Sequence, residues 1–130
     1  MEDLLAFLKA RLDRDEAVAK AGMGASWKVT PGGTVRVDVQ PDGTGEVPRE
    51  RERLGFVASV ENEAYAEHIA RYDPQRVLRQ SAALRRVIAL YEKEQWTRQR
   101  GAPGTGVLET VLRQLASQYA DHPAYRPEWA

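Results

Sequence analysis

The spacing of hydrophobic positions changes several times along the chain, and each spacing predicts a different element. Residues 2–21 carry apolar side chains every three or four positions, with charged side chains largely opposite. Leu4, Leu8 and Leu12 fall on one helical face, so this segment is predicted to form an amphipathic helix. Gly22 should end it, because glycine readily adopts the left-handed conformation that closes a helix.

Residues 26–60 change to a period of two, which is typical of β-strands. Pro-Gly-Gly at 31–33 separates two short runs and predicts the turn of a β-hairpin. A further apolar stretch at 54–60 predicts a third strand of an antiparallel sheet, and the polar segment 40–53 predicts a surface loop. The side chains expected on the buried face are Trp27, Val29, Val35, Val37 and Val39.

Helical spacing returns after the strands. Tyr65, Ile69 and Tyr72 predict a short helix over 62–72. Asp73 and Pro74 then mark a break and a new start, because aspartate caps free backbone N–H groups and proline fits the first helical position.

The helix that follows is predicted over 74–98 and a last one over 106–119. The long helix has an apolar stripe of Val77, Leu84, Ile88 and Tyr91. The tail 120–130 contains two aromatic side chains, Tyr125 and Trp129, and is expected to fold back on the rest of the chain.

Together these elements predict an α+β fold, with a small three-stranded antiparallel sheet packed against about four helices. A length of 130 residues suits one domain, expected to span 1–130.

Composition narrows the function classes. The chain has 19 basic and 19 acidic side chains, so it has no net charge that would attract nucleic acid or an anionic membrane. It has no cysteine, which excludes disulfides and thiolate chemistry. No apolar run is long enough to cross a bilayer, and no signal peptide is expected. We therefore expect a cytoplasmic protein with no membrane association.

Three segments carry a resemblance to a known family. They are LDRDEAVAKAGMGASWKV at 12–29, AEHIARYDPQRVLRQ at 66–80 and YADHPAYRPEW at 119–129. In this order they resemble a family of small actinobacterial and actinophage proteins of unknown function. The resemblance implies a cytoplasmic protein of actinobacterial, prophage or phage origin, and it implies no catalytic residue.

One candidate site combines imidazole and carboxylate groups: His68, Asp73, Asp121 and His122. If the tail approached the 62–72 helix, these groups could hold a metal or exchange protons. The alternative is structural, because each aspartate stands close before a proline, where it can cap a turn. Without a recognised metal motif we assign no catalytic residue, no metal ligand and no cofactor.

Two other patterns do not support an enzyme. GAPGTG at 101–106 precedes a helix, as phosphate loops do, but no lysine follows it and no strand precedes it. None of the serines lies in a Gly-x-Ser-x-Gly elbow.

Basic side chains predominate in residues 74–100, with seven against two acidic ones. Arg79, Arg86 and Lys93 recur every seven residues and therefore share a helix face, and Arg76 precedes them. This face is a candidate for binding a polyanion such as nucleic acid, or it is a solvated surface.

The aromatic tail is the candidate for binding a partner, through Tyr125, Arg126 and Trp129, because these residue types dominate binding hot spots. The same side chains could instead seal the edge of a small core. The sequence therefore favours a non-enzymatic protein that binds another protein. The alternatives are a nucleic-acid-associated protein using the 74–98 helix and a small metal- or acid–base-dependent enzyme around His68 and His122.

Overall fold

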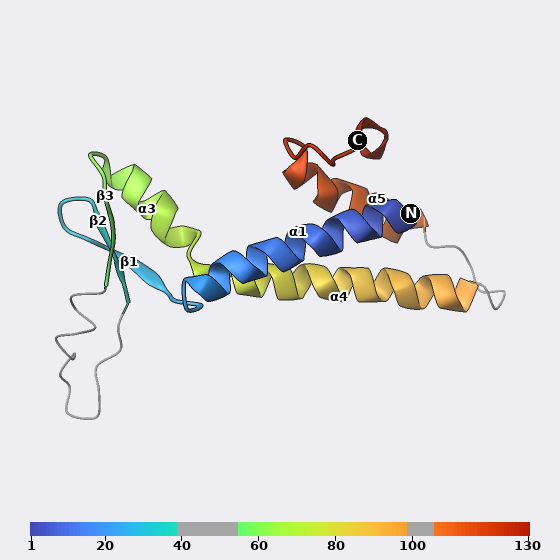
Figure 1. Ribbon diagram of the computed structural model, residues 1–130, viewed down its shortest axis with the longest axis horizontal. Coiled ribbons are helices and arrows are strands. Elements are labelled where there is room, and N and C mark those ends of the chain that lie inside the picture. The colour runs from blue at the N-terminus through green and yellow to red at the C-terminus, as the bar shows by residue number, and fades with distance from the viewer. Residues whose placement is uncertain (39–54, 99–105) are drawn as a thin grey trace, which may run out of the picture. The chain divides into compact units, whose positions relative to one another are not determined.

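The fold is α+β, as predicted. The computed structural model describes residues 1–38, 55–98 and 106–130, and within them the chain forms four α-helices and a three-stranded antiparallel sheet (Figure 1). It divides into two compact units. We call Glu16–Arg79 the sheet unit, and Met1–Asp15 together with Gln80–Ala130 the helical unit.

The sheet has the order β1-β2-β3, with antiparallel pairing throughout. The strands are β1 (Trp27–Thr30), β2 (Thr34–Val37) and β3 (Phe56–Ser59). Gly33 has a φ of 79°, a conformation that glycine adopts without strain, so the Pro-Gly-Gly segment forms the predicted hairpin turn. Val29 pairs with Val35 and Trp27 with Val37, which confirms that the alternating side chains share one face.

That face is only partly buried. Val35 is fully buried, where α3 (Glu63–Arg71) packs against β1 and β2. Val29, at the edge strand, is exposed, and Trp27 is half-buried. The prediction of a buried position was therefore wrong for Val29, which lies on an edge strand of the described sheet, with a neighbouring strand on one side alone.

Helix α3 begins at a side-chain cap. Asn62 Oδ1 accepts a hydrogen bond from the Ala64 N–H at 2.7 Å, which satisfies one of the free donors at the helix start. Its buried residue is Ala66. Tyr65 and Tyr72, whose spacing indicated the helix, are both exposed.

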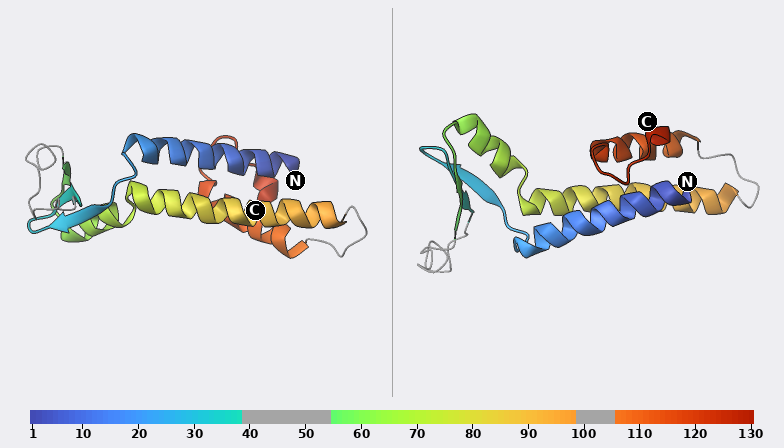
Figure 2. Two further views of the ribbon diagram at one scale, coloured as in Figure 1. Left: turned by 90° about the horizontal axis from the view of Figure 1, so that it is seen from below. Right: turned by 45° about the horizontal axis from the view of Figure 1, so that its top comes forward.

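The helical unit is built from parts of two long helices and a short one. Helix α1 (Glu2–Ala21) contributes its residues up to Asp15, and helix α4 (Pro74–Arg98) contributes its residues from Gln80 onward. The short helix α5 (Gly106–Ala116) lies wholly in this unit. Figure 2 shows the amino-terminal part of α1 antiparallel to the carboxyl-terminal part of α4. The predicted last helix changes to a 3₁₀ turn over Ser117–Tyr119.

A single cluster forms the core of this unit. The α1 members recur with helical spacing, and α4 adds two members of its predicted stripe. The carboxyl-terminal 3₁₀ turn (Pro127–Trp129) adds Trp129, which confirms that the tail folds back. The buried members are Leu4, Phe7, Leu8, Leu12, Ile88, Tyr91, Leu112, Ala116 and Trp129.

Some predictions fall on other parts of the chain. The loop at 40–53, Val39 and most of GAPGTG at 101–106 lie outside the described residues. The single domain 1–130 stays a prediction. Within the described ranges, every helix is too short or too polar to cross a membrane.

Candidate functional site

The aromatic tail, the first candidate for partner binding, packs into the core of the helical unit. The Trp129 ring lies 5.1 Å from the Phe7 ring and 5.6 Å from the Tyr125 ring, measured between centroids, and Trp129 is only 8% exposed. Arg126 lies over Trp129 at 5.7 Å and bonds the Asp3 carboxylate at 2.9 Å. These contacts give the tail a structural role, and partner binding by its residues stays a prediction.

The four polar candidates are distributed over both units. His68 and Asp73 belong to the sheet unit, whereas Asp121 and His122 belong to the helical unit. Among the residues that the structure describes, no group of three His, Cys, Asp or Glu side chains could hold a metal ion.

Three of these four side chains have structural partners. The His68 ring packs against the Tyr72 ring in a tilted arrangement, with 4.9 Å between ring centroids. His122 packs edge-on against Phe7 at 5.7 Å, and its Nδ1 accepts the Ala124 N–H at 3.0 Å. Asp73 accepts two backbone hydrogen bonds, one of which confirms its predicted role as a helix cap. The fourth, Asp121, is exposed in a turn.

The basic side chains of α4 differ in their surroundings. Arg76 lies over the Tyr72 ring at 4.7 Å. Arg79, Arg86 and Lys93 are exposed and recur every seventh residue. Their exposure is compatible with polyanion binding, which stays a prediction.

A groove in the helical unit was not predicted. It has a volume of about 440 Å³ and lies where the first turns of α1 meet the last turns of α4. We call it the Trp96 groove. Its lining consists of Met1, Glu2, Leu5, Tyr91, Glu92, Gln95 and Trp96.

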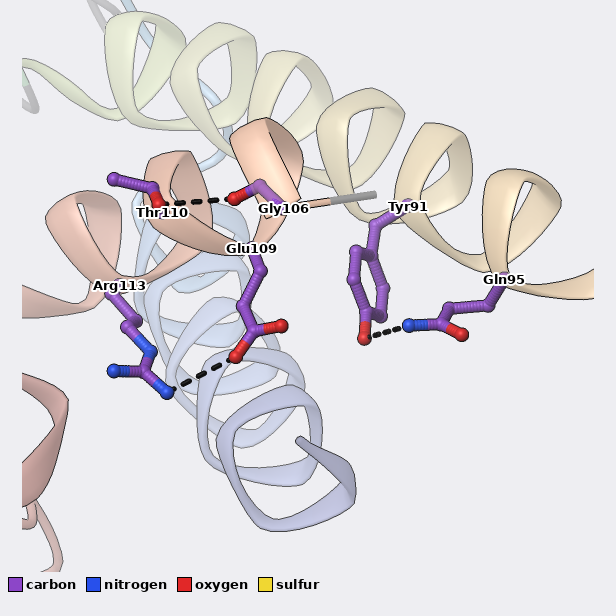
Figure 3. A network of polar contacts seen from close by, with 6 residues as sticks. All are labelled: Tyr91, Gln95, Gly106, Glu109, Thr110 and Arg113. Carbon is purple, nitrogen blue, oxygen red and sulfur yellow. Dashed lines mark hydrogen bonds and ion pairs between the residues drawn. The ribbon is translucent and has the colours of Figure 1, made fainter. Parts of the chain in front are cut away.

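The floor and the wall of the Trp96 groove differ in burial. Tyr91 is 2% exposed and belongs to the core cluster, and its hydroxyl accepts a hydrogen bond from Gln95 (Figure 3). Trp96, the residue after Gln95 on α4, is 56% exposed. The groove therefore has a floor fixed by the core and an aromatic wall open to solvent.

Neighbouring contacts stabilise the helices around the groove. Lys9 and Glu92 form an ion pair of 2.9 Å between α1 and α4. On α5, Arg113 bonds Glu109 at 3.0 Å, and the Thr110 hydroxyl donates to the Gly106 carbonyl (Figure 3). These side chains are about half-exposed or exposed, so each bond contributes little alone.

One titratable group in this unit is strongly shifted. Tyr119 donates a hydrogen bond of 2.7 Å to the Asp15 carboxylate. Burial raises the pKa of Tyr119 well above its usual value of 10, and the bond to Asp15 and its negative charge add to the shift. This tyrosine therefore stays protonated to a higher pH than a free tyrosine and acts as a hydrogen-bond donor.

Periodicity could not identify Trp96, because it lies between Gln95 and Thr97, off the apolar stripe of α4. The sequence feature that could have indicated Trp96 is its position on the polar side of the 74–98 helix. A tryptophan on the polar side of an amphipathic helix is expected to be exposed, and an exposed tryptophan favours an interaction surface.

Comparison with known proteins gives a family and no activity. A family of unknown function, DUF6221, has a sequence model that matches residues 1–130. No curated protein matches the chain. No solved structure matches it either.

Proposed function

We propose that this chain, which belongs to DUF6221, a family of unknown function, is a non-enzymatic protein that binds another protein through the Trp96 groove. The observation that supports this proposal is the exposed indole of Trp96 beside the buried ring of Tyr91. Tryptophan is among the residue types most enriched at the energetic centre of protein interfaces.

The dimensions of the groove suit an anchor side chain of a partner. Its volume of about 440 Å³ lies within the range of ligand pockets. Tyr91 is held by the core and by Gln95, so the floor needs little ordering when a partner binds. Leu5 is half-buried in the same lining and adds an apolar surface.

The charges of the lining favour a basic partner. Glu2 and Glu92 line the groove together with one cation, the α-ammonium group of Met1, so carboxylates outnumber cations in the lining two to one. Glu92 is paired with Lys9, but both side chains are about half-exposed, and such pairs contribute only about 0–1 kcal/mol. A cation on the partner can therefore compete with Lys9, and it can also interact with the Trp96 ring.

The proposed occupant is thus a segment of another protein that carries an apolar side chain next to lysine or arginine. In this proposal Trp129 and Tyr125 serve the site indirectly. They pack on Phe7 and hold the first turns of α1, which line the groove. Arg126 remains a candidate contact beyond the groove, since it is exposed.

The proposal includes the cellular location and the origin of the protein. The absence of cysteine supports a cytoplasmic location. The resemblance of the three sequence segments supports an origin in actinobacteria, their prophages or their phages.

A peptide selection tests the proposal directly. The purified protein is immobilised and used to select from a displayed library of random peptides, and the enriched sequences are synthesised and titrated. We expect enriched peptides to pair an apolar residue with an adjacent Lys or Arg. Trp96→Ala should weaken their binding at least about tenfold, as is usual for a hot-spot tryptophan.

Leu90→Ala is the matched control, because Leu90 is an exposed apolar residue on the same helix that does not line the groove. Its binding should equal that of the wild type. Replacing Glu2 and Glu92 by Gln should reduce the preference for basic peptides. Enriched peptides that bind the Trp96→Ala protein as tightly as the wild type would rule out the groove as the docking site.

A further inference from the structure

Besides the Trp96 groove of the helical unit, the protein has another candidate binding surface in the sheet unit, on the face of the sheet opposite Val35. Lys28 pairs with Arg36 across β1 and β2, and Arg36 pairs with Phe56 across β2 and β3. Directly opposed residues in an antiparallel sheet project to the same side. Lys28, Arg36 and Phe56 therefore form one row across all three strands.

An irregularity in the pairing places Phe56 in this row. The register shifts between Val35 and Arg36, so that their partners on β3 are Ala58 and Phe56. In a regular strand Phe56 would lie on the same face as Ala58, but the extra residue of the bulge moves it to the other face. Phe56 is 56% exposed there, which is unusual for a large apolar side chain on a strand.

The adjacent row adds hydroxyl groups. Thr30, Thr34 and Ser59 oppose one another across the three strands, on the same face as the first row. The Thr30 hydroxyl donates to the Thr34 carbonyl at 3.1 Å. The six positions of the two rows thus contain one aromatic ring, two cations and three hydroxyls, with no carboxylate.

The ion pair that Lys28 forms at this face is weak. Asp38 approaches the Lys28 ammonium at 3.8 Å, and both side chains are about half-exposed. A pair at this distance and exposure contributes little, so the positive charge of Lys28 remains effective toward a ligand.

We infer that this face of the sheet binds single-stranded nucleic acid, with one base stacked on Phe56 and the adjacent phosphates near Lys28 and Arg36. Aromatic side chains beside cations on a sheet are a common means of binding single strands without sequence preference. The row spans two strand spacings, about 10 Å. That distance separates a stacked base on Phe56 from a phosphate contact at Lys28.

A duplex does not fit this arrangement, because its bases are already stacked and cannot reach Phe56. An acidic protein segment would satisfy Lys28 and Arg36, but its carboxylates would not bring a flat ring onto Phe56, whereas a nucleotide carries a base next to its phosphate. The position of Phe56 therefore favours single-stranded nucleic acid over either alternative.

Fluorescence anisotropy with a fluorescein-labelled single-stranded oligothymidylate, at low salt and with the full chain, tests this inference. We expect saturable binding that weakens as salt rises. Phe56→Ala should weaken it roughly five- to 100-fold, in line with the loss of one stacked base. Lys28→Gln should lower the slope of log affinity against log salt concentration by about 0.7, the value for one phosphate contact on a single strand.

Phe56→Leu is the informative companion variant, because it keeps an apolar side chain and removes the flat ring. It should bind as weakly as Phe56→Ala. A second control replaces Arg86 and Lys93 on α4 by Gln and should bind like the wild type.

The following results would each overturn the inference. They are no binding at low salt, wild-type affinity in both Phe56 variants, equal affinity for the duplex, and displacement of the oligonucleotide by polyglutamate at equal charge concentration. Loss of binding only in the Arg86 and Lys93 variant would assign nucleic-acid binding to α4 instead.

Discussion

The carboxylate of Asp73 accepts a hydrogen bond from the backbone N–H of Trp27, a residue 46 positions earlier, at 3.0 Å. Its other oxygen accepts the N–H of Arg76 at 2.8 Å, in the first turn of α4. One nearly buried side chain therefore caps a helix and fixes the start of β1. Within the sheet unit, this bond ties the position of the strand to that of the helix.

Removing this carboxylate should destabilise the sheet unit. Asp73→Ala leaves two N–H groups without their acceptor, and we expect a loss of about 2 kcal/mol in the free energy of unfolding. Asp73→Asn keeps one acceptor oxygen and should lose about half as much. Urea denaturation monitored by circular dichroism measures both. An Asp121→Ala control, which alters an exposed aspartate, should be near neutral, and a similar loss in that control would contradict the assignment.

The tail should behave as part of the core. Trp129→Ala removes a buried ring that contacts Phe7, and we expect a loss of about 3–5 kcal/mol. Trp96→Ala should change stability by no more than about 0.5 kcal/mol, because that side chain is largely exposed. Thermal and chemical denaturation compare the two variants. Equal stability losses would mean that Trp96 has a structural role, which the groove proposal does not allow.

Stability should depend on Tyr119 above pH 10. The folded state raises the pKa of Tyr119, so the unfolded chain ionises first, near its usual value of 10. The stabilisation is therefore fully present below pH 10 and is lost progressively as the pH rises further. Tyr119→Phe has no ionisation at this position, so its stability should decline less with pH in this range.

The measurement is the difference in unfolding free energy between wild type and Tyr119→Phe at pH 8 and again above pH 10. At pH 8 the wild type should be more stable by about 1 kcal/mol, the usual value of one hydrogen bond. Above pH 10 the difference should shrink and then reverse. A difference that is independent of pH would refute the role given to the Asp15 bond.

The hairpin turn offers a matched pair of glycine substitutions. Gly32 and Gly33 both have positive φ values, 87° and 79°, so alanine is strained at either position. At Gly33 a Cβ atom would also lie 2.4 Å from the Val60 carbonyl oxygen, whereas at Gly32 it would meet nothing within 4 Å. Gly32→Ala should cost about 1 kcal/mol, and Gly33→Ala clearly more. The order of the two denaturation midpoints checks this, and the reverse order would show that β3 does not approach the turn as described.

Much of the fold could be predicted from local patterns. The Asp73-Pro74 pair set the start of α4, because capping chemistry depends only on adjacent residues. The alternation around Pro-Gly-Gly predicted the hairpin and the shared face of Trp27 and Val37, because side chains two residues apart in a strand point to the same side.

The features that escaped prediction depend on residues far apart in sequence. The bulge that exposes Phe56 arises from the pairing of β2 with β3, and no local pattern signals it. The Trp96 groove requires the first turns of α1 beside the last turns of α4. Trp129 illustrates the same limit, since composition alone left it equally suited to a core and to an interface.

The central claim is that Trp96, and neither of the other tryptophans, receives the partner. A titration with a selected peptide, followed by ¹H–¹⁵N NMR of the indole N–H signals, tests it most directly. The signals of Trp27, Trp96 and Trp129 are assigned with one Trp→Phe variant each. The account predicts a saturable shift of the Trp96 signal, with the Trp27 and Trp129 signals nearly unchanged. A peptide that binds while the Trp96 signal stays in place and another indole shifts would contradict it.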